Sequence, residues 1–359
     1  GDEKVRSAIE NTRKTNLDCE KLFTPYTILQ NILLDLFSIL IIGAGIFFYH
    51  RGELSFLNTV MTIIISFLAF SQIKLAGSAT TALRVVSGSI EQTGKLEEFP
   101  QMDIEGKDIK PANFNISFEN VEFSYSNKKI LNDISIEIPQ NQMTAIVGPS
   151  GAGKTTFCNL IARFWDIDKG KISLGGHDIK EYSLESLMRQ ISMVFQNVYL
   201  FQDTVENNIK FAKPDATHEE VVEAAQKACC HDFIMSLPEQ YETVIGEGGT
   251  NLSGGERQRI SIARAMIKNA PIIIFDEATA NIDPENEDKL QVAMEELTRN
   301  KTVIMIAHRL KTIKNANQIL VLANGKITQR GTHEELIQTN GIYKNFVEAR
   351  QIAVNWKLS

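Results

Sequence analysis

The residues with the clearest chemistry stand in a glycine-rich stretch directly after the apolar run MTAIV. The stretch fits GxxxxGK[ST], a pattern whose glycines let backbone N–H groups curl around phosphate oxygens. Lys154 would reach the terminal phosphates, and the Thr155 hydroxyl would ligate Mg²⁺ at a helix N-terminus. The loop therefore predicts a nucleoside triphosphate site made of Gly148, Pro149, Ser150, Gly151, Ala152, Gly153, Lys154, Thr155 and Thr156.

Two adjacent carboxylates end another apolar run, PIIIFDE. We expect Asp276 to bind the metal ion and Glu277 to polarise the attacking water. Positioning and charge neutralisation supply most of the acceleration in phosphoryl transfer, so the pair fits hydrolysis of a γ-phosphate. A strand that ends in Asp-Glu is common, however, and kinases, GTPases and many ATPases share the phosphate loop. These two features leave the family open.

The stretch LSGGE, followed by RQRISIARAM, narrows the choice. It resembles the signature of the ATP-binding-cassette (ABC) family and the helix behind it. A serine hydroxyl and glycine amides at a helix start form a second phosphate-binding cup. By the resemblance this cup closes on ATP that the partner subunit holds, and it consists of Ser253, Gly254, Gly255 and Glu256.

Four more residues match the family pattern in the expected order: Tyr125, Gln196, Asp283 and His308. The resemblance implies that Tyr125 stacks on adenine and that Gln196 links Mg²⁺ and the water to the membrane domain. It also implies that Asp283 spans the dimer and that His308 contacts the γ-phosphate. A single Tyr, Gln or His is usually structural, so the ordered set carries this assignment.

The resemblance therefore implies ATP and Mg²⁺ as ligands of the cassette. It gives Glu277, His308 and Gln196 catalytic roles, and Thr155, Gln196 and Asp276 metal-binding roles. Two departures from the family pattern stand out: Glu256 replaces the commoner Gln, and 280–283 read Ala-Asn-Ile-Asp instead of Ser-Ala-Leu-Asp. Neither removes a phosphate or metal ligand, so we expect activity to persist.

The elements that must position these residues follow from the hydrophobic pattern. The stretches ISFENVEFSY and ILNDISIEI alternate like strands, and the apolar runs IIIFD and TVIMIA alternate with helical stretches. This pattern predicts an α/β domain with a mostly parallel sheet and an antiparallel edge sheet. By the resemblance it is a P-loop NTPase cassette with a helical subdomain, over residues 116–359 behind a linker at 99–115.

Residues 1–98 read as the C-terminal part of a transmembrane domain, with membrane helices at about 27–49 and 56–73. Each run is close to the roughly 20 residues that span a bilayer core. The short link between them predicts an antiparallel hairpin whose other two ends face the cytosol with the cassette. The alternative is a buried helical hairpin in a soluble protein. Asn31 and Asp35, one helical turn apart, would be either functional in the membrane or close to the cytosolic end, facing a missing helix.

Composition excludes several classes. Acidic residues outnumber basic ones by 44 to 37, so no electrostatic footprint for nucleic acid is present. A hydrophobic content of 43% is ample for a packed core. The beginning of the chain has no signal-peptide pattern. The cysteines form no CxxC pair or Cys/His cluster and are expected to be reduced packing residues: Cys19, Cys158, Cys229 and Cys230.

Hairpin and cassette together resemble the rear of an exporter-type half-transporter, with residues up to Pro25 leading into the fifth of six membrane helices. A fragment and a truncated product both fit. The expected partners are a second half-transporter subunit, in a homodimer or heterodimer, and the lipid bilayer of the cell membrane. Substrate and direction stay open. The alternatives are a soluble ABC-type ATPase of DNA repair or translation, which the hairpin disfavours, and a silent regulatory cassette, which Glu277 and His308 disfavour.

Overall fold

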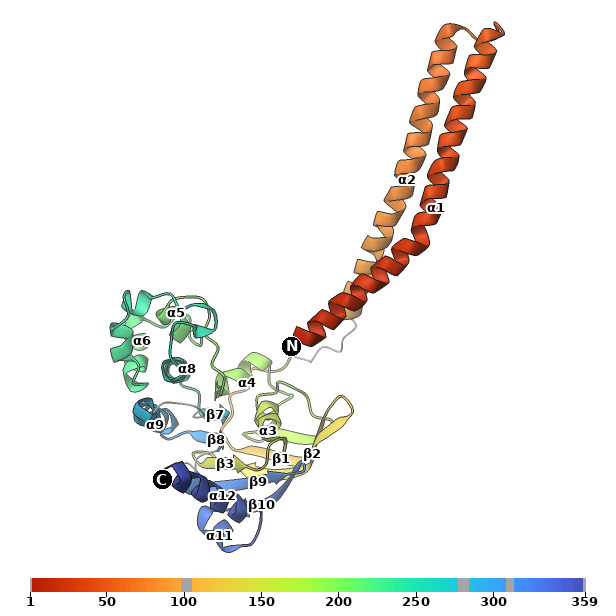
Figure 1. Cartoon of the computed structure of the whole chain (residues 1–359). Helices are drawn as coiled ribbons and strands as arrows, with labels where there is room; N and C mark the ends of the chain where they lie inside the picture. The colour runs from red at the N-terminus through yellow and green to blue at the C-terminus, as the bar shows by residue number, and fades with distance from the viewer. Residues whose placement is uncertain (1, 98–104, 277–283, 308–312, 358–359) are drawn as a thin grey trace. The chain divides into compact units, whose positions relative to one another are not determined.

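A computed structural model of the chain describes residues 2–97, 105–276, 284–307 and 313–357 (Figure 1). It divides into two compact units, Gly1–Gln101 and Met102–Ser359, and each is described here by itself. The predicted linker at 99–115 lies partly outside the described residues, and its limits stay a prediction.

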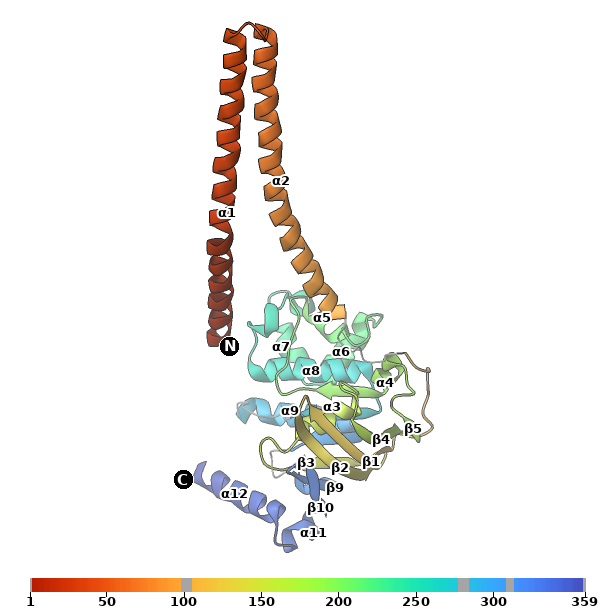
Figure 2. The ribbon, with the colours of Figure 1, turned by 90° about the vertical axis from the view of Figure 1, so that its right-hand side faces the viewer.

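The first unit is a hairpin of two long helices, α1 (Asp2–His50) and α2 (Phe56–Glu97), which run antiparallel (Figure 1, Figure 2). They approach through small side chains. A Cβ atom on Gly45 would lie 3.8 Å from Cγ2 of Thr59. Thr59 and Ser66 of α2 are buried. Small residues at such an interface favour close packing of helices in lipid, where no hydrophobic driving force acts between them.

An ion pair joins the two helices. Nζ of Lys74 lies 2.5 Å from Oδ1 of Asp35. The acidic group on α1 thus has a partner within this chain, whereas the sequence suggested a functional group or one facing a missing helix. The neighbouring Asn31 is exposed.

Both helices contain a segment long and apolar enough to cross a membrane, Arg13–His50 and Phe56–Ala76. In their most apolar stretches only 6% and 11% of the residues are buried within the structure. Within the described residues, therefore, these helices are not the core of a soluble domain.

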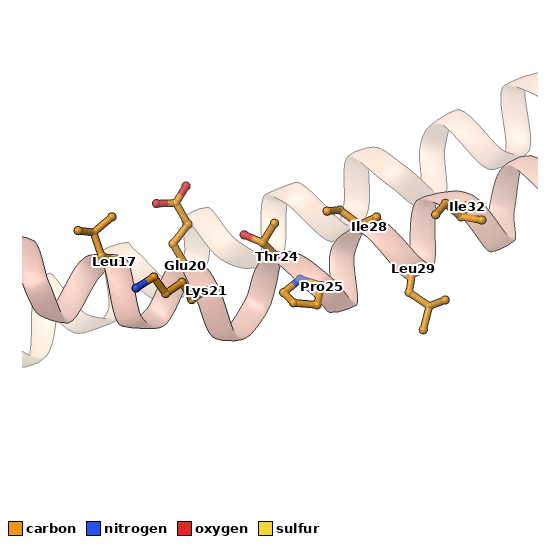
Figure 3. A pocket seen from close by; sticks show the side chains of 8 residues that line it. All are labelled: Leu17, Glu20, Lys21, Thr24, Pro25, Ile28, Leu29 and Ile32. Atoms are coloured by element: carbon orange, nitrogen blue, oxygen red, sulfur yellow. The ribbon is translucent and has the colours of Figure 1, made fainter.

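A shallow groove of about 650 Å³ follows α1 around Pro25, a residue without an N–H group to donate to the helix (Figure 3). Its lining comes from α1 alone: Leu17, Glu20, Lys21, Thr24, Pro25, Ile28, Leu29 and Ile32. Glu20 and Lys21 lie on one side of Pro25, together with Leu17, and only apolar side chains, Ile28, Leu29 and Ile32, line the other side.

The second unit is built on a six-stranded sheet in the order β10-β9-β3-β8-β7-β6. All neighbours are parallel except β10 and β9. The five parallel strands are almost continuously buried, as expected when both faces of a parallel sheet are covered, whereas the edge strand β10 is half-exposed. Their bounds are β3 (Met143–Val147), β6 (Ile191–Val194), β7 (Ile272–Asp276), β8 (Thr302–Ile306), β9 (Gln318–Ala323) and β10 (Lys326–Gly331).

A second sheet of four antiparallel strands has the order β2-β1-β4-β5. Side chains along β2 alternate between buried and exposed, because one face packs inward and the other meets solvent. Between the two sheets lies α3 (Lys154–Ile161), whose Phe157 ring stacks on Phe118 at 4.4 Å. The strands are β1 (Ile116–Tyr125), β2 (Lys128–Ile138), β4 (Lys169–Leu174) and β5 (His177–Asp178).

Helices cover the other face of the six-stranded sheet. On β3, Ile146 belongs to the core around α3, while Ala145 and Val147 belong to the core on the opposite face. The predicted class, a mostly parallel α/β sheet with an antiparallel edge sheet and helical subdomain behind an all-α hairpin, is confirmed. The remaining helices with bounds inside the described residues are α4 (Leu184–Gln190), α5 (Val205–Lys210), α6 (His218–Lys227), α7 (His231–Met235), η1 (Gln240–Glu242), η2 (Glu247–Gly249), α8 (Gly254–Lys268), α9 (Pro284–Thr298), α11 (His333–Gln338) and α12 (Ile342–Lys357).

Candidate functional site

The sheet register brings the chemical motifs to one edge. Ile306 of β8 pairs with Ile146 of β3 on one side and with Asp276 of β7 on the other. On the next strand, β6, Val194 pairs with Phe275. The carboxyl ends of these parallel strands therefore meet, which is where open α/β sheets bind ligands.

The loop after β3 needs glycine at both ends. Gly148 has φ 152°, and a Cβ atom there would lie 2.0 Å from the carbonyl oxygen of Leu322. Gly153 has φ 100°, and its Cβ atom would lie 2.8 Å from Cδ2 of Leu131. A side chain at Gly148 would force the loop away from the backbone of β9, and at Gly153 the left-handed backbone favours glycine.

Lys154 closes this loop on itself. Its Nζ donates to the carbonyl oxygens of Gly148 and Pro149, each at 3.0 Å, and its side chain is buried. The N–H of Ala152 donates to the Pro149 carbonyl at 3.3 Å. The ammonium group thus lies over the loop, where a phosphate chain would meet its positive charge. Of the other loop residues, Ser150 and Gly151 are exposed.

The first turn of α3 opens on the same loop. Gly153 stands at its N-cap with a left-handed backbone and no side-chain cap. Uncapped N–H groups at a helix start favour a phosphate ligand, through hydrogen bonds and the helix dipole. Thr156 is buried in this turn, and Thr155 is exposed.

Thr155 and Asp276 meet across the site. The Thr155 hydroxyl lies 3.3 Å from Oδ1 of Asp276 and donates to it. A hydroxyl and a single carboxylate fit Mg²⁺, which is commonly held by one or two carboxylates together with substrate phosphates. Among the described residues no group of three or more His, Cys, Asp or Glu side chains is placed to hold a metal ion.

Of the other predicted residues, Gln196 follows β6 at this edge and is exposed. Three predicted residues, Glu277, Asp283 and His308, lie outside the described residues. Glu277 directly follows Asp276 in the chain, and His308 directly follows buried Ala307.

A buried thiol lies behind the loop. Cys158 of α3 is fully buried, and burial, with a smaller contribution from the negative charge of Asp276, raises its pKa well above the ordinary range. The thiol is therefore neutral and acts as a packing group, as the sequence suggested.

Tyr125 ends β1 within a cluster of three aromatic rings. Its ring centroid lies 4.8 Å from that of Phe123 and 5.2 Å from that of Trp165, and both pairs are nearly perpendicular. Trp165 did not stand out in the sequence. It follows α3 at a distance in the chain from Tyr125, and no local spacing indicates the contact.

The signature residues begin α8. Ser253 is the N-cap, and its Oγ accepts from the N–H of Glu256 at 3.3 Å. The Glu256 carboxylate accepts in return from the N–H of Ser253 at 2.8 Å, which completes a capping box. A Cβ atom on Gly254 would meet nothing within 4 Å, and Gly255 is buried. The glycine at 254 is therefore not required by any contact within the described chain.

Helix α8 also contacts the segment that carries Gln196. Nε2 of the buried Gln258 donates to the carbonyl oxygen of Phe195 at 3.3 Å. Nη1 of Arg257 donates to the carbonyl oxygens of Leu252, at 2.6 Å, and Gly249. The signature helix thereby holds both the segment before it and the backbone beside Gln196.

An apolar groove of about 470 Å³ begins at this segment. Arg264 of α8 lies against it, with its guanidinium 5.4 Å from the Phe211 ring centroid and its Nε donating to the Asn208 carbonyl. Five aromatic side chains at the groove are exposed on the cassette surface: Phe164, Phe195, Tyr199, Phe201 and Phe211.

Comparison with known proteins agrees with this geometry. Residues 131–280 match the family model described as ABC transporter. The fold and the site thus define an ATP-binding cassette of the ABC class of ATPases. Residues 131–280 thus form an ABC transporter domain.

Its relatives are exporters and flippases. It is 51% identical over 228 residues, 64% of this chain, to the ATP-dependent lipid A-core flippase of Syntrophus aciditrophicus. It is 46% identical over 248 residues, 68% of this chain, to that of Haemophilus influenzae. The chain spans 38% and 42% of the length of these two relatives.

A solved structure, that of a bacterial Atm1-family ABC exporter with ATP bound, is similar with a TM-score of 0.81 and 32% identity. The match covers 98% of this chain and 62% of that one. The predicted family is therefore confirmed, and none of these relatives supports a soluble ATPase of DNA repair or translation.

Proposed function

We propose that this chain binds Mg-ATP at the carboxyl edge of the six-stranded sheet, hydrolyses it, and thereby drives movement of a substrate across a membrane. The observation that carries the proposal is the meeting of Lys154, Thr155 and Asp276 at that edge. The cation and the hydroxyl come from the start of α3, after β3, and the carboxylate comes from the end of β7.

In this mechanism, Lys154 and the N–H groups of the loop hold the phosphates, and the ring of Tyr125 stacks on the base. Thr155, Asp276 and Gln196 would hold Mg²⁺, which neutralises charge on the phosphates. Glu277 orients and polarises the water for in-line attack, since a carboxylate with its negative charge favours loss of a proton from that water. His308 stabilises charge on the γ-phosphate.

A second cassette completes each site, in either a homodimer or a heterodimer. The open space at Gly254 supports this, because a glycine amide at a helix start suits an approaching phosphate that the same chain does not supply. Asp283 would lie between the two cassettes.

In this proposal the hairpin lies in a membrane and the cassette lies in the cytosol. Two helices of sufficient length and hydrophobicity support this location. Gln196, which by the family resemblance would link Mg²⁺ and the water to the membrane domain, follows β6 beside an exposed apolar groove, and α8 connects this segment to the signature. Hydrolysis would thus be coupled to the permease. Two of the relatives are named for lipid A, and the movement of a lipid-like amphiphile is the corresponding substrate class for this chain.

The decisive test is the substitution Glu277→Gln in the full chain. The amide keeps the shape of the side chain but loses its charge, so we expect ATP hydrolysis to fall by about a hundredfold or more while Mg-ATP binding is retained. Lys154→Ala is the comparison variant, and it should lose binding as well.

Steady-state ATPase assays and nucleotide titration on paired cassettes measure both quantities. If the unaltered chain pairs and binds ATP but does not hydrolyse it, the cassette is a regulatory one without turnover. Near-normal hydrolysis by Glu277→Gln would remove that residue from its role.

A further inference from the structure

The Tyr125 ring, on which the proposed function stacks adenine, contacts two other aromatic rings. Tyr125 and Phe123 come from β1, and Trp165 comes from the segment after α3. The centroid of Trp165 lies 5.2 Å from Tyr125 at 83° and 6.5 Å from Phe123 at 53°. Nearly perpendicular rings at these distances have the favoured edge-to-face geometry.

Trp165 lies in a turn that a neighbouring ion pair restrains. Arg163 before it adopts a left-handed backbone with φ 51° and is almost fully buried. Its Nε donates to Oδ1 of Asp166, the residue after Trp165, at 2.9 Å. This ion pair joins the residues on either side of Phe164 and Trp165 and so restrains the turn that carries the indole.

The indole is also partly accessible, with 51% of its surface exposed. A buried tryptophan at this position would be explained by core packing alone. Here a large apolar ring stays half in solvent beside the residue expected to stack on a base, and Tyr125 is itself partly exposed.

We propose that Trp165 is a positioning residue for the base end of the ATP site: its ring fixes the plane of the Tyr125 ring on which adenine stacks. The inference rests on the proposed ATP binding and adds a residue to it. Without the indole, the Tyr125 ring has Phe123 on one side only and samples other orientations. Stacking of the base on Tyr125 then becomes less favourable, while the contacts of the phosphate loop, at the other end of the nucleotide, are unchanged.

The first test separates the base from the phosphates. In Trp165→Ala, the KM for ATP should rise roughly three- to tenfold, the range that corresponds to losing one edge-to-face pair. The kcat and the inhibition constant of inorganic tripolyphosphate, which has no base, should stay within about twofold of the wild-type values.

Three comparison variants sharpen this test. Tyr125→Ala should raise the KM for ATP by at least as much, and Trp165→Phe should restore most of the wild-type value because it keeps an aromatic edge. Met235→Ala removes another exposed apolar side chain of the cassette, outside the site and the groove, and should change neither constant.

The second test leaves Trp165 in place. The chain has two tryptophans, Trp165 and Trp356, so the background substitution Trp356→Phe makes Trp165 the sole emitter. We expect ATP to change its fluorescence and tripolyphosphate at a saturating concentration to leave it unchanged. This measurement decides the question even if Trp165→Ala does not fold.

The outcomes are distinct. If neither ATP nor tripolyphosphate binds to the unaltered chain, the proposed function fails. If both bind but ATP leaves Trp165 emission unchanged and Trp165→Ala leaves the KM unchanged, only the present inference fails. An equal loss of ATP and tripolyphosphate affinity in Trp165→Ala would show a merely structural role and would also overturn it.

Discussion

Two glycines of the site, Gly148 and Gly254, differ in what surrounds them. A side chain on Gly148 would collide with the backbone of Leu322 in β9, at 2.0 Å. One on Gly254 would meet nothing within 4 Å. The first glycine is explained by the fold of its own chain, and the second requires an explanation outside it.

Alanine substitutions at these two glycines should therefore affect different properties. Gly148→Ala should lower the midpoint of thermal unfolding and weaken ATP binding, because the loop must move away from β9. Gly254→Ala should leave the unfolding midpoint and the binding of ATP by single cassettes unchanged, yet reduce hydrolysis by about tenfold or more, since a methyl group obstructs the approaching phosphate. Calorimetry, nucleotide titration and ATPase assays measure these three quantities.

Full ATPase activity in Gly254→Ala would contradict a close approach of phosphate to this helix start. A loss of thermal stability in the same variant would contradict the open space around the residue.

At the scale of elements, the start of α8 explains an unusual residue of the signature. Glu256 replaces the glutamine that is commoner in the family, and its carboxylate accepts from the N–H of Ser253. A glutamine amide oxygen accepts the same bond, so both residues complete the capping box.

Glu256→Gln should accordingly leave the unfolding midpoint and the ATPase rate nearly unchanged. Glu256→Ala leaves the N–H of Ser253 without this partner. It should lower the free energy of unfolding by about 1 kcal/mol, and with it the midpoint of thermal unfolding by roughly 2–4 °C. Thermal unfolding of the full chain in detergent compares the two variants. A large loss of activity in Glu256→Gln at unchanged stability would show that the negative charge acts on the nucleotide.

The elements that sequence predicted best are the buried parallel strands. The runs MTAIV and IIIFD coincide with β3 and β7, because a strand covered on both faces must be apolar throughout. The phosphate loop was equally readable, since its glycines are required by backbone geometry. The capping box of α8 has a local pattern as well, Ser followed three residues later by Glu.

Contacts between distant segments could not be predicted in this way. The approach of Trp165 to Tyr125 depends on how α3 packs against β1, and no periodicity encodes it. The pair of Lys74 and Asp35 depends on the register of two helices, which a short link leaves undetermined. The roles of Glu277, Asp283 and His308 remain predictions from family resemblance.

For the whole molecule, the proposed composite site makes a strong prediction. Ser253 is the N-cap of α8, and Lys154 begins α3, after β3. In a dimer, each cassette would therefore supply the phosphate loop of one site and the signature of the other. Lys154→Ala damages the phosphate loop alone, and Ser253→Arg places a bulky cation in the signature alone. Each variant should be nearly inactive, and a mixed dimer of the two should regain partial ATPase activity, because one of its sites then has both intact halves.

Dimer formation and ATP binding by the mixed sample serve as controls, measured by cross-linking and nucleotide titration. Mixed dimers that form, bind ATP and stay as inactive as the single variants would rule out a composite site in the homodimer.

The strand order of the six-stranded sheet also has a consequence for synthesis. Ile146 of β3 pairs with Ile306 of β8 and Leu320 of β9, both of which leave the ribosome much later. At ordinary rates of translation, the strand before the phosphate loop waits roughly ten to thirty seconds for its neighbours. Throughout that interval its apolar side chains and its unpaired backbone N–H and C=O groups are open to wrong partners, and the site cannot form until almost the whole cassette has been made.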